Sequence, residues 1–304
     1  MMTAGKKSPD ETWLGKGDSL FEEYRYEEAL EAYGKVRAVD KGYLHAVNRM
    51  GTILSLMDRD EEALACFRTV LELGPENPLL ADTALNNMAA ILRKHGRFDE
   101  ALAAYDRALD LEPKNVMALC NKGNVFGDLG RDGEALAMYE RALEIEPENA
   151  ALLVNKAYAL TGLNRPEEAL AVIDRALELD PGNIMALNNR GNVLSELSRD
   201  EEAILMFDRA LENDPERVGS MVNKGISLSK LGRHEEALAA FDRALIHDPD
   251  NILALDNKGC VLSELGRDRE ALVAYERALD LNPADEGLRR NFERLLKKIG
   301  KRSG

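Results

Sequence analysis

One pattern constrains the fold of this chain more than any other: a unit of 34 residues recurs along nearly its whole length. In the unit at 116–149, the eighth place is small, the twentieth is Ala, the twenty-fourth is aromatic and the thirty-second is Pro. These residues are Gly123, Ala135, Tyr139 and Pro147. The same frame predicts eight repeats, at 10–43, 44–77, 82–115, 116–149, 150–183, 184–217, 218–251 and 252–285.

Two helices can be predicted within each repeat. Leu119, Gly123 and Phe126 follow one another at i, i+4 and i+7, and Ala135 and Tyr139 have the same spacing in the second half. The small residues allow the two helices to approach closely, and the aromatic ring fills the space beside them. Such units bury their apolar faces mainly against their neighbours, so we expect a stack rather than one globular core.

A 34-residue period with this pattern of small residue, Ala, aromatic and Pro resembles the tetratricopeptide repeat, TPR. The first repeat also has Trp13 at the Trp place of that family. The resemblance covers residues 10–285. It implies an all-α fold, a right-handed TPR superhelix, which is an α-solenoid of eight helix-turn-helix repeats closed by a C-terminal capping helix.

The turns and helix starts follow a second set of regularities. Between the two helices of a repeat, Gly130, Gly232 and Gly266 are expected in the left-handed conformation. The Asp two residues later is expected to cap the second helix, at Asp132, Asp200 and Asp268. Asn side chains are expected to cap the first helices, at Asn77, Asn115, Asn149, Asn183 and Asn251. Arg217 breaks this series.

Three segments depart from the repeat. Residues 1–9 are expected to be a disordered leader, in which Ser8 opens a capping box for the first helix. Residues 78–81 insert about one helical turn, so we predict a longer first helix in repeat three. Residues 286–304 predict a capping helix with a basic tail, whose apolar side is Leu288, Phe292, Leu295 and Ile299. A basic docking tail is the alternative for this segment.

Composition excludes several classes of function. The net charge of -15 argues against a nucleic-acid partner, because phosphate recognition needs clustered Lys and Arg. No apolar run approaches 18 residues and the N-terminus does not resemble a signal peptide, so we expect no membrane association. Cys66, Cys120 and Cys260 lack metal or disulfide spacing, which favours a reducing, cytoplasmic location.

Signals for chemistry are thin. His234-Glu235-Glu236 begins like a zinc-protease motif, but no second His follows at the required spacing. Acidic pairs are too abundant for any one of them to identify a general acid and base. We therefore expect a non-enzyme with no catalytic residue, no metal site and no cofactor.

The informative positions lie on the first helix of each repeat. Places two, five, six and nine cluster on the side facing away from the partner helix, and in the TPR family this stripe lines the concave groove. In repeats three to seven none of the twenty residues at these places is charged, although the charged content of the chain, 31%, predicts about six. A stripe kept neutral in this way is not an ordinary solvated face.

Place six of the stripe is Asn in six consecutive repeats: Asn87, Asn121, Asn155, Asn189, Asn223 and Asn257. A side-chain amide has donors and an acceptor that match the N–H and C=O of a peptide unit. The row resembles the asparagine ladder of TPR superhelices such as that of O-GlcNAc transferase. Duplication of one ancestral unit explains the recurrence, but not why neighbouring places diverged while this one stayed.

The resemblance and the stripe together predict a non-catalytic protein-interaction scaffold that binds an extended segment, uncharged or apolar in part, in its concave groove. The expected contacts add other stripe residues to the six asparagines: Asn124, Asn192, Met117, Met185, Tyr158, Val154 and Val222. The residue set that clamps chaperone EEVD tails is missing, so such tails are excluded as ligands. We expect a monomer. The alternatives are a structural spacer or assembly subunit without a groove peptide, and a regulatory subunit of an enzyme.

Overall fold

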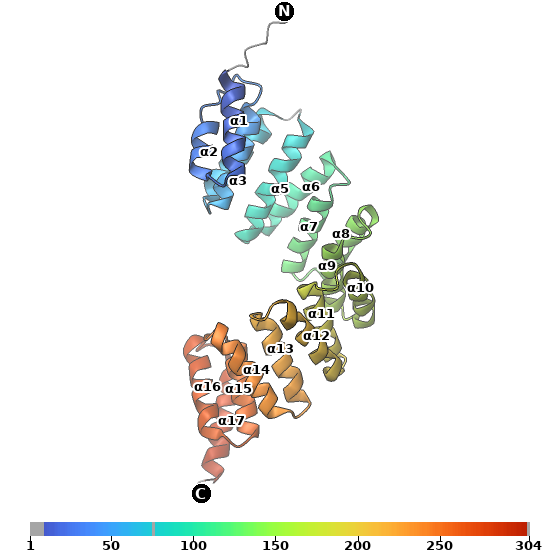
Figure 1. The fold of residues 1–304 in the computed structure, drawn as a ribbon, viewed down its shortest axis with the longest axis vertical. Coiled ribbons are helices and arrows are strands. Elements are labelled where there is room, and N and C mark those ends of the chain that lie inside the picture. Colours follow the sequence, from blue (N-terminus) through green and yellow to red (C-terminus); the bar gives the residue numbers. More distant parts are fainter. Residues whose placement is uncertain (1–8, 75–76, 303–304) are drawn as a thin grey trace, which may run out of the picture. The chain divides into compact units, whose positions relative to one another are not determined.

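The computed structural model describes residues 9–74 and 77–302, and within these ranges it contains seventeen α-helices and no strand (Figure 1). The leader expected at 1–9, with the capping box of Ser8, lies outside the described residues apart from Pro9, at which the first helix begins. The chain divides into two compact units, residues 1–147 and 148–304. All elements are helical, as the repeat pattern predicts.

Unit 1 contains four helix pairs. Their bounds are α1 Pro9–Glu22, α2 Tyr26–Tyr33, α3 Tyr43–Leu56, α4 Asp60–Leu73, α5 Pro78–Lys94, α6 Phe98–Leu111, α7 Val116–Asp128 and α8 Asp132–Ile145. The insertion at 78–81 forms the first turn of α5, which has 17 residues where α7 has 13. The prediction of a longer first helix in repeat three is confirmed.

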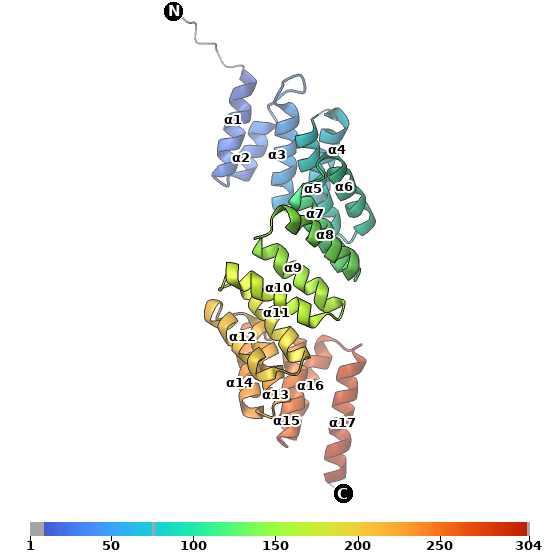
Figure 2. The ribbon, with the colours of Figure 1, turned by 90° about the vertical axis from the view of Figure 1, so that its right-hand side faces the viewer.

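Unit 2 contains four further pairs and a last, unpaired helix. Their bounds are α9 Ala150–Gly162, α10 Pro166–Leu179, α11 Ile184–Glu196, α12 Asp200–Asn213, α13 Val218–Lys230, α14 His234–His247, α15 Ile252–Glu264, α16 Asp268–Leu281 and α17 Glu286–Arg302. The last helix packs against α15 and α16 (Figure 2). Leu288 and Leu295 of α17 are buried in that contact.

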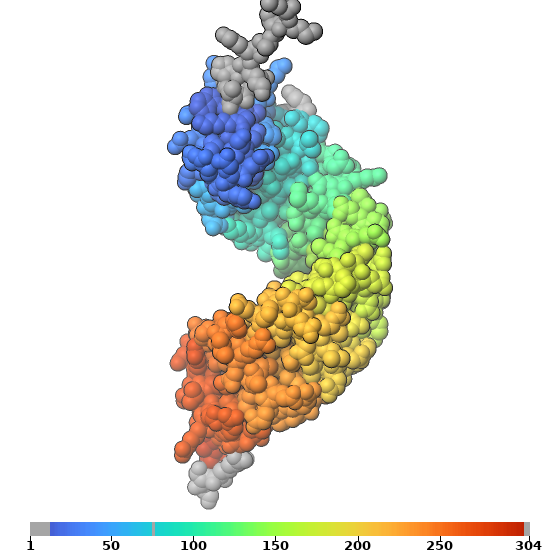
Figure 3. Space-filling view, viewed as in Figure 1, coloured from blue at the N-terminus to red at the C-terminus, as the bar shows by residue number. Residues whose placement is uncertain are grey.

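In six of the eight pairs the two helices meet where a glycine faces an aromatic ring. A Cβ on Gly123 would lie 2.6 Å from Cε1 of Tyr139, so α7 and α8 approach more closely than any side chain at this place allows. The same contact joins Gly51 to Phe67 and Gly225 to Phe241. Side chains fill the space between paired helices, and each unit presents a continuous surface (Figure 3). The expected role of the small and aromatic places is confirmed.

The turn within each pair requires a left-handed residue. Gly130, Gly232 and Gly266 have φ of 67°, 73° and 77°, as expected from the sequence. Gly96 serves repeat three in the same way. The remaining four turns use other residues at positive φ, namely Tyr24, Asp58, Asn164 and Ser198.

Helix starts follow the predicted rule in the first helices but not in the second. Asn115 caps α7 by accepting a hydrogen bond from the N–H of Ala118, and Asn77, Asn149, Asn183 and Asn251 act alike. Arg217 caps α13 without a side-chain bond, as its break in the series predicts.

The prediction that Asp132, Asp200 and Asp268 cap the second helices is wrong. Each is the first residue inside its helix, and the preceding Arg occupies the cap position. The guanidinium of that Arg folds back onto the Glu three residues later; for example, Arg199 Nε lies 2.7 Å from Glu202 Oε1. The Asp instead places a negative charge in the first turn, where it favours the helix dipole.

Candidate functional site

The uncharged stripe of the first helices is not equally exposed at its four places. Met117 and Met185 at place two are 52% and 49% exposed, and Tyr158 at place nine is 66% exposed. Large apolar side chains that remain this exposed offer contact surface to a partner. The structure therefore places these three expected site residues at the surface of their own units.

Place five is buried in four of the repeats three to seven, which changes the expected site. Val154 and Val222 are 6% and 2% exposed, and Asn86 and Asn188 are buried as well. In α11 and α13, for example, Ser220 donates a hydrogen bond of 2.8 Å to Oδ1 of Asn188 on the preceding first helix. The expectation that Val154 and Val222 contact a ligand is therefore not supported, because both side chains are used in packing within unit 2.

The six asparagines at place six are all partly exposed. The side chains of Asn121 and Asn189 make no hydrogen bond with any residue in the described part of the chain. Asn223 Nδ2 donates to Oδ1 of Asn192 at 2.8 Å, and Asn257 Nδ2 donates to the carbonyl of Leu253 at 2.8 Å. Asn155 is also engaged within the chain, and Asn87 donates to Thr52 Oγ1 at 3.4 Å.

Place nine has a second role that depends on the aromatic at place twenty-four. Tyr139 donates its hydroxyl proton to Oδ1 of Asn124 at 2.8 Å. Tyr33 and Tyr275 donate in the same way to Asp18 and Cys260. Asn124 therefore helps to satisfy a buried phenol, whereas Asn192 belongs to a repeat that has Phe207 instead. The sequence signal for this bond is the pairing of Tyr with a polar residue fifteen positions earlier.

Tyr105 departs from this arrangement, because Ala90 occupies place nine of its repeat. Its buried hydroxyl has no hydrogen-bond partner among the described residues. Burial raises the pKa of Tyr105 to about 12, and the phenol stays neutral at physiological pH.

The stripe continues onto α17, which sequence reasoning missed because it interpreted the segment as a cap or a basic docking tail. Asn291 stands 34 positions after Asn257, and its Nδ2 donates to Asp256 Oδ1 at 2.9 Å. Burial raises the pKa of Asp256. Arg290 and Arg294 line a hollow of about 510 Å³ beside Leu253 and Asn291. In unit 2 the uncharged stripe thus ends at two arginines.

Within the described ranges, His, Cys, Asp and Glu side chains form no group of three or more that could hold a metal ion. None of the three cysteines forms a disulfide with another described residue, and all three are partly buried. None of the described helices combines the length and the apolar character needed to cross a membrane.

The family model of the tetratricopeptide repeat matches the chain at residues 42–114, 80–148 and 217–284. A second model of the same description matches residues 120–184 and 155–218. The matches follow one another without a gap. The chain belongs to the tetratricopeptide repeat family. Proteins built from tetratricopeptide repeats are protein-interaction scaffolds and are typically non-catalytic.

Solved structures agree on the fold. A tetratricopeptide repeat protein from Parabacteroides merdae has a TM-score of 0.69 at 18% identity, covering 83% of this chain and 98% of its own. The type IV pilus biogenesis factor PilW has a TM-score of 0.65 at 21% identity, covering 71% of this chain and 98% of its own. The Cut9–Hcn1 structure has a TM-score of 0.69 at 16% identity, covering 96% of this chain and 57% of that one. No curated protein matches this tetratricopeptide repeat chain.

Proposed function

We propose that this tetratricopeptide repeat protein is a non-catalytic scaffold that binds an extended polypeptide segment along the stripe of its first helices. In unit 2 the proposed contacts are Asn155, Tyr158, Met185, Asn189, Asn192, Asn223 and Asn257. In unit 1 they are Asn87, Met117, Asn121 and Asn124. Val154 and Val222 support the stripe from beneath instead of contacting the ligand.

The observation that carries the proposal is the combination of exposure and missing charge. Charged residues cover most of an ordinary solvated helix face, yet this stripe exposes Met117, Met185 and Tyr158 between amides. Exposed apolar residues that recur side by side on one face are typical of interaction sites. Their apolar surface would be removed from water by a ligand that is itself uncharged or partly apolar.

The asparagines provide the directional part of recognition. An Asn side chain can accept from a backbone N–H and donate to a backbone C=O, whatever side chain the ligand carries at that point. Asn189 is available for both bonds in the ligand-free protein. Asn223 and Asn257 would exchange bonds within the chain for bonds to the ligand, and so would contribute less than Asn189.

The charge and the groove also define what is not bound. The net charge of -15 and the uncharged stripe argue against nucleic acid and against strongly acidic tails. We propose a monomer in a reducing, cytoplasmic compartment, where Cys66, Cys120 and Cys260 would remain thiols.

The test compares a stripe variant with a control elsewhere on the same unit. Peptides of twelve residues are first selected from a random displayed library on the parent protein. Their dissociation constants are then measured for Asn155→Ala/Asn189→Ala/Asn223→Ala. Each lost amide should cost about 0.5–1.5 kcal/mol, so the triple variant should bind about ten-fold to two-thousand-fold more weakly if the losses add.

The control is Asn213→Ala, which removes an exposed amide from α12, outside the stripe. It should bind like the parent. N-methylation of the central ligand amides should weaken binding to the parent, whereas single side-chain changes in the ligand should be tolerated. Parental affinity in the triple variant would contradict the proposal.

A structural role for the row is the second candidate, and one observation favours it. The bonds from Asn223 to Asn192 and from Asn257 to Leu253 are internal to unit 2 and need no ligand. On this view the chain is a spacer or an assembly subunit. The triple variant would then unfold at lower denaturant concentration than the parent and select the same peptides with the same affinity.

A further inference from the structure

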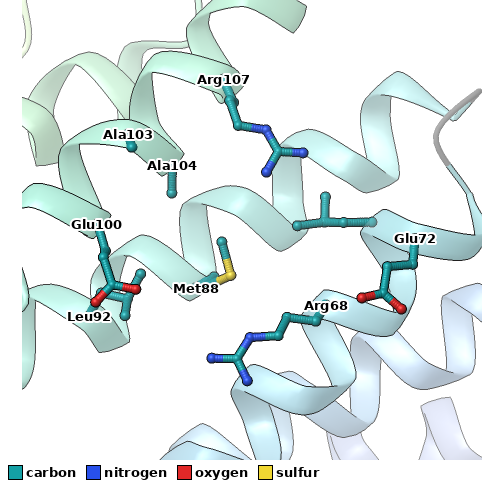
Figure 4. A pocket seen from close by; sticks show the side chains of 9 residues that line it. Arg68, Glu72, Met88, Leu92, Glu100, Ala103, Ala104 and Arg107 are labelled. Atoms are coloured by element: carbon teal, nitrogen blue, oxygen red, sulfur yellow. The ribbon is translucent and has the colours of Figure 1, made fainter.

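A hollow in unit 1 lies away from the stripe, between the second helices of two successive repeats. Its walls are α4 and α6, its floor is α5, and its volume is about 410 Å³ (Figure 4). The apolar part of its lining is formed by Leu71, Met88, Leu92 and Ala104. Arg68 and Arg107 reach into it from opposite walls (Figure 4). A volume of this size is within the range of small-molecule sites.

An ion pair found in later repeats is missing beside this hollow. In later repeats a cation at place seven of the first helix reaches an Asp at place twenty-five of the preceding repeat. Lys224 Nζ lies 2.6 Å from Asp208 Oδ1, and Arg190 Nε lies 2.7 Å from Asp174 Oδ1. Lys122 with Asp106 and Lys258 with Asp242 follow the same rule. The long stems of these cations lie along the cleft.

Between repeats two and three the rule is broken on both sides. Place seven is Met88, and place twenty-five is Arg68, so the cleft has a shorter apolar side chain and a cation where the others have a carboxylate. The matching region of unit 2 has a hollow of about 260 Å³ beside Lys224 and Leu228 and one of about 590 Å³ beside Asp208 and Arg243. The exchange of two residues thus reverses the charge on one wall, and this charge, not the volume, distinguishes the hollow of unit 1.

The charges of the lining favour an anion. The side chains of Arg68 and Arg107 form no hydrogen bond or ion pair with any described residue. Of the two acidic lining residues, Glu100 is held in a two-bond pair by Arg97, which lowers the pKa of Glu100, with a smaller contribution from Arg68. Glu72, with a weaker contribution from Glu100, is left to balance two guanidinium groups.

We propose that this hollow binds a small amphipathic carboxylate, with an apolar tail on Met88, Leu92 and Ala104 and the carboxylate between Arg68 and Arg107. Guanidinium groups pair with carboxylates through two parallel hydrogen bonds. The ion pair of Lys122 with Asp106 occupies the equivalent cleft toward repeat four. The hollow therefore does not continue as an unpaired cleft toward repeat four. It suits a small molecule better than an extended polypeptide.

The experiment uses octanoate as the probe and the intact chain. Calorimetric titration gives the dissociation constant and stoichiometry, and the shift of the Met88 ε-methyl signal in carbon-13 spectra gives the place. One octanoate should bind per chain and shift the Met88 signal. Octanol, with the same tail and no carboxylate, should bind at least five-fold more weakly.

Two reciprocal variants test the cause. Arg68→Asp/Met88→Lys installs the ion pair of the later repeats, and should weaken octanoate binding at least ten-fold while the helical circular dichroism stays unchanged. Asp208→Arg/Lys224→Met removes that pair from unit 2, and should raise the stoichiometry from one to two. Any one of three results would overturn the proposal: octanol binds as tightly as octanoate, Arg68→Asp/Met88→Lys binds octanoate like the parent, or octanoate leaves the carbon-13 signal of Met88 unchanged.

Discussion

A single hydrogen atom at Gly123 decides how closely α7 and α8 approach. Its missing Cβ would stand 2.6 Å from the ring of Tyr139, whereas a Cβ on Gly127 of the same helix would meet nothing within 4 Å. The two glycines therefore have opposite effects on stability. At Gly123 the absence of a side chain is required by packing, and at Gly127 it only increases the entropy of the unfolded chain.

Gly123→Ala is expected to destabilise the protein by about 1–3 kcal/mol, because the new methyl group overpacks the contact with Tyr139. Gly127→Ala, the matched control, should stabilise by about 0.5–1 kcal/mol. Denaturant midpoints followed by circular dichroism measure both. In repeat three Ala89 occupies the place of Gly123 and lies beside Tyr105. A small shift of the two helices therefore makes room for a methyl group, and a loss of stability near the lower limit is consistent with such a shift. Equal changes at both glycines would contradict the assigned contact.

Ser198 provides a second residue-scale test, because it has a φ of 60° at a place where four of the other turns have glycine. Ser198→Gly should remove about 1–2 kcal/mol of left-handed strain. The entropy of the more flexible unfolded chain offsets about 0.4–1 kcal/mol of this gain. The expected net stabilisation is about 0.5–1 kcal/mol by chemical denaturation. The reverse exchange, Gly232→Ser, should destabilise by a similar amount, and a stabilising effect there would refute the argument.

At the scale of elements, ion pairs connect the start of one second helix to the end of the following first helix. Asp60 at the start of α4 is buried, and its Oδ2 lies 2.8 Å from Nζ of Lys94 and 2.8 Å from Nε2 of His95 at the end of α5. Asp200 is near Lys230, and Asp268 pairs with Lys298 of α17. Each pair joins a repeat to its successor, so it stabilises the stack and not a single helix pair.

The pH dependence of stability should report the Asp60 contact. The hydrogen bond from Lys94 is the main cause that lowers the pKa of Asp60. A folded-state pKa below the unfolded value contributes stability above the unfolded pKa, near 4, and this stability is lost as pH falls through the folded value. Asp60→Asn should therefore lower the denaturant midpoint at pH 7, and the difference from the parent should shrink toward pH 3.

Asp132→Asn is the control for this experiment. Asp132 holds the same place in α8, but the residue that corresponds to Lys94 is Gly162, and no described residue forms an ion pair with Asp132. Its substitution should change the midpoint at pH 7 less than Asp60→Asn does. A pH-independent difference for Asp60→Asn would show that the side chain acts by packing and not by charge.

At the scale of the whole molecule, burial is shared among neighbouring repeats instead of being gathered in one centre. One apolar cluster of unit 2 runs from Ile204 through Phe241 to Leu295, and thus joins residues from α12 to α17. A separate apolar cluster around Tyr33 and Ile53 joins α1, α2 and α3 in unit 1. In a stack of this kind, stability is approximately a sum of repeat and nearest-neighbour terms.

Phe241→Ala should therefore destabilise locally. Removal of the fully buried ring should cost about 3–5 kcal/mol in the repeat that contains it. Amide hydrogen exchange should accelerate in α13, α14 and the helices that contact them, while amides of α1 to α4 keep the parental rates. Phe67→Ala in α4 is the mirror experiment. Uniform acceleration along the chain in either variant would mean that the stack unfolds as one cooperative body.

Much of the fold follows from the sequence alone, because the relevant signals are local. The Asn caps, the glycines at positive φ, the long α5 and the contact of Gly with an aromatic ring all depend on residues of one helix pair or one turn. Because the repeats have the same pattern, most of these signals occur several times in the chain and are easier to recognise. The exposed stripe residues Met117, Met185 and Tyr158 also follow from helical periodicity.

The tertiary structure decided what depends on the next repeat. Val154 and Val222 belong to the stripe by angle, but the neighbouring first helix covers place five, and periodicity within one helix contains no information about that neighbour. The continuation of the stripe onto α17 and the hollow beside Met88 likewise arise from contacts between successive units of the stack. Such contacts are set by how the repeats stack, and only the positions of the side chains in three dimensions reveal them.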